Sequence, residues 1–514
     1  MVDSVGQGDF DELAPRAAAM IESMRAYGYT LATAIADLVD NSVTAGAANV
    51  WLDAWWAGRN SWITLTDDGH GMFEHELRDA MRLGSRSPLE ARMPSDLGRF
   101  GLGLKTASLS QCRRLTVISR RSECERHIRR WDLDHLSRRD VHGWQLLRSV
   151  HPDSTAPLDR FDRLECGTTV LWEDLDRLVS TAHSDDKRVQ DHFLRSLQDV
   201  EQHLAMVFHR HLEGPRKRLR IFVNGNELAP WDPFLEHHPA TTSTPEERIE
   251  LPGHDSPIVF RGFVLPHKDR LSDAEHAAAA GPTGWSGQQG FYLYRNERLI
   301  VPGSWLGMRG TRAWTKEEHY KLARIRLDVP NSMDHLWHLD VKKSHATPPP
   351  LIRERLVGLA QNVRQSARDV FAHRGKYGKR AAKKEYERPW KVIRLADRVD
   401  YRIDRDHPLV AAVLSDLPAD RRSEAEVMLR VIEETVPVQQ IWLDAAESPQ
   451  DTSAPFAHAS SQDRVALVLT AYRAIRRNRG LDHEATLGVL RACEEFADDE
   501  TEAILASYAE GLNR

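Results

Sequence analysis

Cysteine is scarce in this chain, with four among 514 residues and no pair in Cys-x-x-Cys spacing. This argues against a disulfide-built fold and against a cysteine-rich zinc module. No apolar run reaches the roughly 20 residues that a membrane-spanning helix needs. The N-terminus lacks the basic and apolar segments of a secretion signal. We therefore expect a protein of the reducing cytoplasm.

Positive charge is not in excess either, because 70 Lys and Arg face 76 Asp and Glu, a net charge of −6. Any contact with nucleic acid must then come from a local basic patch. Residues 353–394 form such a stretch, with thirteen basic side chains against four acidic ones. This stretch could neutralise DNA phosphates while Tyr377, Tyr386 and Trp390 stack on bases. The alternative is a basic helix face that pairs with the acidic C-terminal helices, and both interpretations stay open.

The composition is otherwise that of a folded protein, with 41% apolar and 28% charged residues. The length allows roughly two to four domains. Helical and alternating apolar patterns mix over residues 1–185 and 215–346, a helix connects them over 186–214, and 347–514 is almost wholly helical in pattern. We expect helices at Ala17–Arg25, Leu31–Thr44, Phe73–Arg82 and Val189–Leu212, and strands at Val50–Trp56, Trp62–Thr66, Leu115–Arg120, Thr168–Trp172, Leu219–Val223, Gly290–Tyr294, Ala323–Asp328 and His338–Val341.

The first chemically suggestive segment is the predicted helix that carries Asp37 and Asn41. The two residues are four apart, so they share one helix face. A carboxylate there can accept a proton from water, and a carboxamide oxygen is a hard ligand suited to Mg²⁺. The simpler alternative is the polar face of an amphipathic helix.

Two further segments are short and weak when taken alone. Asp67, Gly69, Gly71 and Met72 follow a predicted strand. A carboxylate at a strand end can accept a hydrogen bond from an exocyclic amine such as that of adenine, and glycines let the backbone approach a flat ligand. The alternative is a tight Asp-Gly turn. Thr168 belongs to a Gly-Thr-Thr-Val segment whose simplest interpretation is the entry to a strand.

The remaining segment has Gly-x-x-Gly-x-Gly spacing, formed by Gly98, Gly101 and Gly103 before a predicted helix. Glycines ahead of a helix N-terminus offer the exposed N–H groups and the dipole that a polyphosphate needs. The spacing is not that of a dinucleotide-binding turn. Leu104 also intrudes before Lys105, which would rotate the lysine by about 100° from its place in a P-loop.

These four segments together, in this order, resemble the signature of the GHKL ATPase superfamily, with greatest similarity to prokaryotic MORC-like and MutL-like ATPases over residues of about 15–350. The resemblance implies an α+β protein in which a Bergerat-type α/β sandwich, with 84–98 as ATP lid, precedes a ribosomal-protein-like transducer domain and a mainly helical C-terminal region. It implies ATP and Mg²⁺ as ligands. The implied roles are Mg²⁺ ligation by Asn41, adenine recognition by Asp67, a base pocket lined by Gly69, Gly71 and Met72, phosphate binding by Gly98, Gly101, Leu102, Gly103 and Lys105, and assistance at the adenine side by Thr168.

One residue departs from the family pattern. Hydrolytic members carry Glu where this chain has Asp37, whose reach to the attacking water is shorter by about 1.5 Å. Misplacement of that order can cost roughly a hundredfold in rate. We expect slow hydrolysis with Asp37 as base, while ATP binding without turnover stays possible.

Lys342 or Lys343, at the end of a transducer strand, would contact the γ-phosphate; the alternative is a solvated lysine pair.

The resemblance implies an ATP-gated homodimeric clamp, often around DNA. Prokaryotic relatives suggest a restriction–modification or anti-phage context in which a nuclease belongs to a partner protein. The rivals are a chaperone-like clamp on a protein client and a scaffold that binds ATP without hydrolysing it. The C-terminal third has no MutL-type nuclease motif, and its histidines are scattered without metal-binding spacing, so we expect no metal site there.

Overall fold

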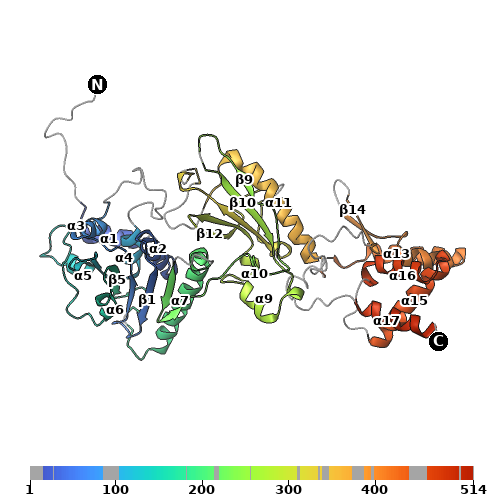
Figure 1. The fold of residues 1–514 in the computed structure, drawn as a ribbon, viewed down its shortest axis with the longest axis horizontal. Helices are drawn as coiled ribbons and strands as arrows, with labels where there is room; N and C mark the ends of the chain where they lie inside the picture. The colour runs from blue at the N-terminus through green and yellow to red at the C-terminus, as the bar shows by residue number, and fades with distance from the viewer. Residues whose placement is uncertain are drawn as a thin grey trace, which may run out of the picture. The chain divides into compact units, whose positions relative to one another are not determined.

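The computed structural model describes the chain with gaps, over residues 15–26, 28–84, 103–180, 182–213, 219–254, 256–309, 313–333, 336–337, 346–372, 387–394, 399–438, 441, 460–496 and 499–512. It divides into two compact units, Met1–Tyr377 and Gly378–Arg514 (Figure 1). Each unit is described by itself. None of the helices within the described ranges is both long and apolar enough to cross a membrane.

The first unit begins with a seven-stranded sheet of order β4-β3-β5-β2-β1-β6-β7. All neighbouring strands run antiparallel except β1 and β6, which are parallel. The strands are β1 (Asn49–Trp55), β2 (Trp62–Asp67), β3 (Arg114–Arg120), β4 (His127–Asp132), β5 (Gly167–Glu173), β6 (Arg220–Val223) and β7 (Asn226–Glu227).

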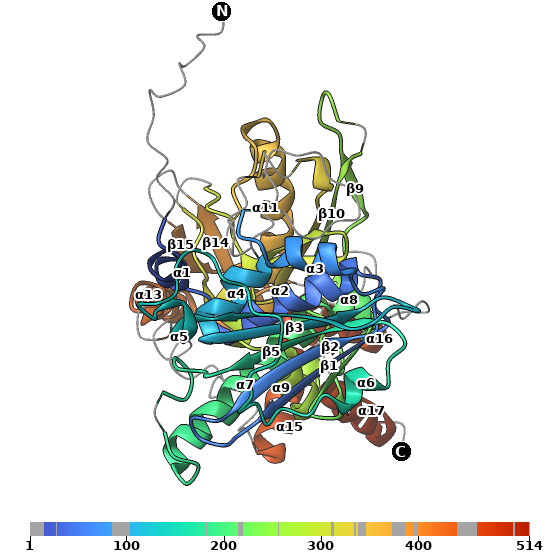
Figure 2. The ribbon, with the colours of Figure 1, turned by 90° about the vertical axis from the view of Figure 1, so that its left-hand side faces the viewer.

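Helices α1 to α4 lie together over this sheet (Figure 2). Helix α2 presents Ile35, Leu38 and Val39 to the core, where they are buried in one cluster with Leu52 and Leu65 of the sheet. Helices α4 and α7 both pack against α2. The helices around this sheet are α1 (Ala17–Arg25), α2 (Leu31–Thr44), α3 (Glu74–Met81), α4 (Gly103–Gln111), α5 (Leu133–Leu136), α6 (Asp159–Asp162), α7 (Lys187–Val207) and α8 (His209–Leu212).

A second sheet follows, of order β12-β11-β13-β10-β8, with β9 also paired to β10. Helix α11 (Pro350–Ala372) packs on β10 and β13. Gly262 of β10 permits this contact, because a Cβ there would lie 2.3 Å from Cγ2 of Val363. The other elements are β8 (Thr242–Ser243), β9 (Glu247–Ile249), β10 (Ile258–Val264), α9 (Asp273–Ala279), α10 (Gly284–Gly287), β11 (Gly290–Arg295), β12 (Arg298–Ser304) and β13 (Ala323–Asp328), with 3-10 turns at Lys268–Arg270, Glu318–Tyr320 and Asn331–Met333.

The second unit contains a two-stranded antiparallel hairpin as well as helices. The sequence pattern predicts an almost wholly helical region, and this hairpin is the correction. Each strand is only five residues long, and although Val399–Ile403 alternates apolar and charged residues, so short a run is a weak signal beside the long helical patterns around it. The elements are β14 (Trp390–Arg394), β15 (Val399–Ile403), α12 (Pro408–Asp416), α13 (Ala419–Glu434), α15 (Ser461–Arg479), α16 (His483–Ala492), a 3-10 turn η4 (Glu494–Phe496) and α17 (Asp499–Leu512).

Most expected elements of the first unit are present within one or two residues of their predicted ends. The strand expected at Leu219–Val223 is present as β6, yet it joins the first sheet beside β1. That sheet therefore includes residues beyond the boundary predicted at residue 215. The strand expected at His338–Val341 and the part of the basic stretch at residues 373–386 lie outside the described residues.

Candidate nucleotide-binding site

Helix α2 starts at a defined point and thereby fixes the first pair of site residues. The hydroxyl of Thr30 caps the helix by accepting a hydrogen bond from the backbone N–H of Thr33 at 3.2 Å. One helix face then carries both Asp37, which is 7% exposed, and Asn41, which is exposed. The hydroxyl of Tyr29 donates to Oδ2 of Asp37 at 3.0 Å. This bond orients the carboxylate without removing its capacity to accept a further proton.

The N-terminus of α4 lies over the same carboxylate. A Cβ added to Gly103, the first residue of α4, would lie 3.7 Å from Oδ2 of Asp37. The structure therefore brings the predicted base next to the helix start that follows the glycine segment. Gly98, Gly101 and Leu102 lie outside the described residues, as does nearly all of the predicted lid.

Asp67 is the last residue of β2 and is 5% exposed. Its Oδ1 accepts the backbone N–H of Gly69 at 3.0 Å, and its Oδ2 accepts the hydroxyl of Ser42 at 2.9 Å. Burial raises the pKa of Asp67 to about 6, against the opposing effect of these hydrogen bonds. The backbone N–H of Thr168 also approaches this carboxyl group. A carboxylate offers about four acceptor positions, so the ionised group can still accept a hydrogen bond from an exocyclic amine.

The two glycines after Asp67 are required by close backbone approach. Gly71 has φ +66°, and a Cβ there would lie 2.0 Å from the carbonyl oxygen of Arg120. A Cβ at Gly69 would lie 2.7 Å from Cβ of Ala45. Neither position accepts a side chain without movement of the backbone, which explains the Asp-x-Gly-x-Gly pattern physically.

A hydroxyl pair ties this segment to the neighbouring strands. The hydroxyl of Ser119 on β3 accepts the backbone N–H of Met72 at 2.9 Å and lies 2.9 Å from the hydroxyl of Thr168 on β5. Thr168 is paired with Asp67 across β2 and β5. The structure thus brings together Asp67, Met72 and Thr168, three residues that the sequence places as much as 101 positions apart.

Lys105 has a different environment from the other site residues. It is 2% exposed, and its ammonium donates to the carbonyl oxygens of Ala80 at 2.9 Å and Arg82 at 2.8 Å, at the end of α3. Burial lowers the pKa of Lys105 to about 8. These two hydrogen bonds must break before the ammonium can reach a phosphate. Lys342 and Lys343 lie outside the described residues.

Sequence reasoning missed three supporting hydroxyls, namely Tyr29, Ser42 and Ser119. Ser42 directly follows Asn41, so the sequence shows that it lies near the motif. The sequence does not show that its hydroxyl bonds to Asp67. A separate cavity of about 650 Å³ is lined by Met20, Arg78, Trp131 and Trp144 among others, and by none of those predicted site residues that the structure describes.

Comparison with known proteins identifies the first domain. Residues 29–168 match the family described as "Histidine kinase-, DNA gyrase B-, and HSP90-like ATPase". These residues form a GHKL-type ATPase domain. The matched range contains Asp37, Asn41, Asp67 and Thr168, so the GHKL match covers the geometry described above. It ends at residue 168, within β5.

One curated relative of this GHKL domain is ATPase morc-1 of Caenorhabditis elegans, 32% identical over 89 residues. The matched stretch is 17% of this chain and 10% of the relative. Among solved structures, the ATPase and transducer domains of DNA topoisomerase II from Balamuthia mandrillaris align at 14% identity and TM-score 0.35, over 66% of this chain and 85% of that one. The N-terminal domain of a DNA repair protein aligns at 14% identity and TM-score 0.39, over 69% and 98%.

Proposed function

We propose that this chain binds ATP with Mg²⁺ and hydrolyses it slowly. The observation that carries the proposal is the buried Asp67 at the end of β2, whose carboxylate keeps acceptor capacity beside Gly69 and Gly71 within the matched domain. That donor and acceptor set fits the edge of an adenine ring. Around it, Met72 and Thr168 line the base pocket.

The polyphosphate end of the ligand would lie between α2 and the start of α4. The exposed amide of Asn41 is a suitable ligand for Mg²⁺, whose charge would offset that of the phosphates. Gly98, Gly101, Leu102 and Gly103 would offer backbone N–H groups to the phosphates. Lys105, and Lys342 or Lys343, would supply positive charge there, Lys105 only after leaving its two carbonyl partners.

Asp37 would act as the base for the attacking water. The hydroxyl of Tyr29 donates to Oδ2 of its carboxylate at 3.0 Å and so orients the group, and the carboxylate remains able to accept a proton from water. The aspartate is one methylene shorter than the glutamate of hydrolytic relatives, and the resulting loss of reach makes turnover slow.

Steady-state ATP hydrolysis with and without Mg²⁺ tests this proposal. We expect turnover in the wild type that falls at least about a hundredfold in Asp37→Asn, while ATP binding by calorimetry is kept. Asp67→Asn should lose binding. Single Lys342→Met and Lys343→Met variants identify the phosphate-contacting lysine as the one whose loss lowers kcat. Tight ATP binding without turnover in any form would leave a scaffold and contradict the enzyme.

We further propose an ATP-dependent homodimer that closes on DNA in the cytoplasm of a prokaryote, with a nuclease or another defence protein as partner. The support is the similarity to MORC-like proteins and the basic stretch at residues 353–394. Sedimentation with a non-hydrolysable ATP analogue should show dimers, and duplex DNA affinity should fall steeply with salt. Salt-independent binding of unfolded protein instead of DNA would favour the chaperone-like alternative, which suits the acidic remainder of the chain.

A further inference from the structure

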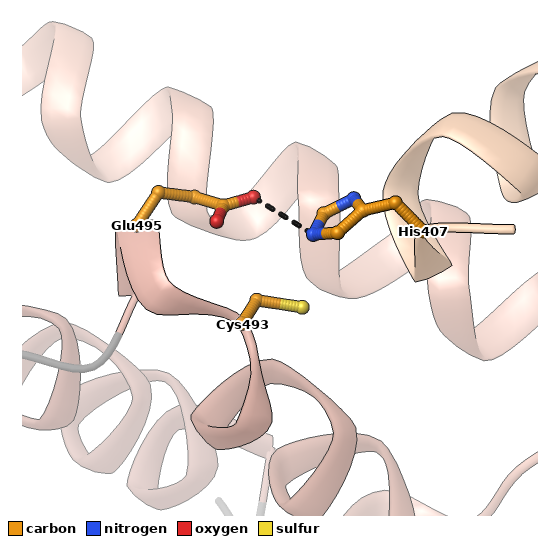
Figure 3. A group of neighbouring side chains, drawn as sticks. All are labelled: His407, Cys493 and Glu495. Atoms are coloured by element: carbon orange, nitrogen blue, oxygen red, sulfur yellow. Dashed lines mark ion pairs between the residues drawn. The ribbon is translucent and has the colours of Figure 1, made fainter. Parts of the chain in front are cut away.

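The second unit brings the side chain of His407 next to those of Cys493 and Glu495, which lie more than eighty positions later in the sequence. His407 directly precedes α12, Cys493 directly follows α16, and Glu495 lies in η4 (Figure 3). One ligand atom from each residue lies within 4.8 Å of the others. No metal site was expected from the scattered histidines, because the 86 positions between His407 and Cys493 conceal this proximity.

His407 is the most informative member of this cluster. Its side chain is 1% exposed, and neither ring nitrogen has a hydrogen-bond partner among the described residues. Its Nε2 nevertheless lies 3.3 Å from Oε1 of Glu495. A buried imidazole without hydrogen bonds is costly, and native proteins usually satisfy such a group. Figure 3 shows the ring facing Glu495, with Cys493 beside them.

We propose that His407, Cys493 and Glu495 form a binding site for a divalent transition metal, with Zn²⁺ as the best fit. The combination of an imidazole nitrogen, a thiolate and a carboxylate is typical of zinc. Zinc bond lengths place tetrahedral ligand atoms about 3.3–3.6 Å apart. The nitrogen–oxygen distance already fits, and the thiol has about 1 Å to move. Water would take the fourth position.

Charge balance supports the same assignment. Cysteine binds a metal as the thiolate, so a bound divalent cation would release the thiol proton of Cys493 to solvent. One thiolate, one carboxylate and a neutral imidazole then cancel the two positive charges, which suits a buried position.

The site would join parts of the second unit that are separate in sequence. The metal would tie the start of α12 to the end of α16 and to η4. The backbone N–H of Glu387 also donates to the carbonyl oxygen of Ala492 at 2.8 Å, which brings the segment before β14 next to the site. The metal would therefore act as a structural tie within this unit.

Two variants and two matched controls are available. Cys493→Ser and His407→Gln remove ligands. Cys112→Ser is the control for the first, because Cys112 is also buried and its thiol donates to the carbonyl four residues earlier, as that of Cys493 does. His483→Gln is the control for the second, because His483 lies in the same unit but bonds to Tyr472 at 2.7 Å.

The test uses the full-length chain with Co²⁺ and Zn²⁺ as probes. We expect one Co²⁺ per chain, a sulfur-to-cobalt charge-transfer band in the near ultraviolet, and loss of that band when Zn²⁺ displaces Co²⁺. Both ligand variants should bind at least about tenfold more weakly, while both controls bind as the wild type. If the ligand variants do not fold, the test rests on the wild-type protein, which should show the band and a Tm that rises when Zn²⁺ is added. Absence of the band in the wild type, or its persistence in folded Cys493→Ser, would overturn the site and leave an ordinary ion pair beside a thiol.

Discussion

Asp40 of α2 and Arg298 of β12 form a buried ion pair that joins the two sheets of the first unit. Nε of Arg298 lies 3.0 Å from Oδ1 of Asp40, and the two side chains are 5% and 2% exposed. The guanidinium also lies over the ring of Phe208 at 5.4 Å. Burial and the adjacent guanidinium lower the pKa of His203 to about 4, so no further positive charge arises there at neutral pH. Asp40 directly precedes Asn41, so the helix that carries the proposed catalytic face is fixed to the second sheet.

Removing one partner of this ion pair should be far more damaging than removing both. Arg298→Met leaves the Asp40 charge buried without its cation, which should lower the free energy of unfolding by about 3–5 kcal/mol. The double variant with Asp40→Asn should recover a large part of that loss. Denaturant unfolding of the two single variants and the double variant measures the coupling. Strictly additive losses would contradict an energetic link between the residues.

The raised pKa of Asp67 predicts a pH-dependent cost of keeping this carboxylate buried. Its pKa is about 6 when folded and close to 3.8 when unfolded, so the folded state binds the proton more tightly and wild-type stability falls as pH rises through this window. Asp67→Asn removes the charge. The variant should therefore gain stability relative to wild type between pH 4 and 6, by up to about 3 kcal/mol, and lose ATP binding.

Parallel unfolding curves at several pH values provide this test, with the difference between variant and wild type as the quantity of interest. In this difference the contributions of the other carboxylates to stability cancel, because variant and wild type share them. It should level off above pH 6 to 7, where Asp67 is ionised in both folded and unfolded protein. A difference that does not change between pH 4 and 7 would show that Asp67 has an ordinary pKa.

Gly46 is a matched control for Gly71, the last residue of the Asp-x-Gly-x-Gly turn. Both have positive φ, +66° and +71°, but a Cβ at Gly46 meets nothing within 4 Å, whereas one at Gly71 meets the carbonyl oxygen of Arg120. Gly46→Ala should cost about 1 kcal/mol for the backbone conformation alone. Gly71→Ala should cost clearly more and should weaken ATP binding. If both variants lose the same stability in thermal unfolding, the proposed clash between a side chain at Gly71 and Arg120 is contradicted.

Asp37→Glu tests the proposed reason for slow hydrolysis. The added methylene restores the reach found in hydrolytic relatives, so kcat should rise by roughly tenfold to a hundredfold, with little change in KM. Tyr29 must make room for the longer side chain, so Tyr29→Phe in combination is the informative second variant. A fall in kcat in both backgrounds would show that the site is built for aspartate.

The local geometry of the proposed nucleotide motifs could be predicted from sequence because each motif depends on what the local backbone requires. Gly71 must lack a side chain, Asp67 must end a strand, and Asp37 and Asn41 must share a helix face. Each of these requirements appears in the sequence as a fixed spacing between residues. The pairing of Asp40 with Arg298 spans 258 positions, and that of Ser42 with Asp67 joins a helix to a strand, so no local pattern reports them. The hairpin β14–β15 was missed because its strands are only five residues long, so the alternation of Val399–Ile403 is a weak signal between long helical patterns.

Strand β6 bears on how this protein can be divided. The family match ends at residue 168, but β1 pairs with β6, from Asn49 beside Arg220 to Leu52 beside Val223. A fragment that stopped near residue 185 would leave one side of β1 with unpaired N–H and C=O groups, an open edge that invites self-association. A piece that keeps β1 paired on both sides must extend at least through β6, so the family match and the first sheet end at different places in the chain.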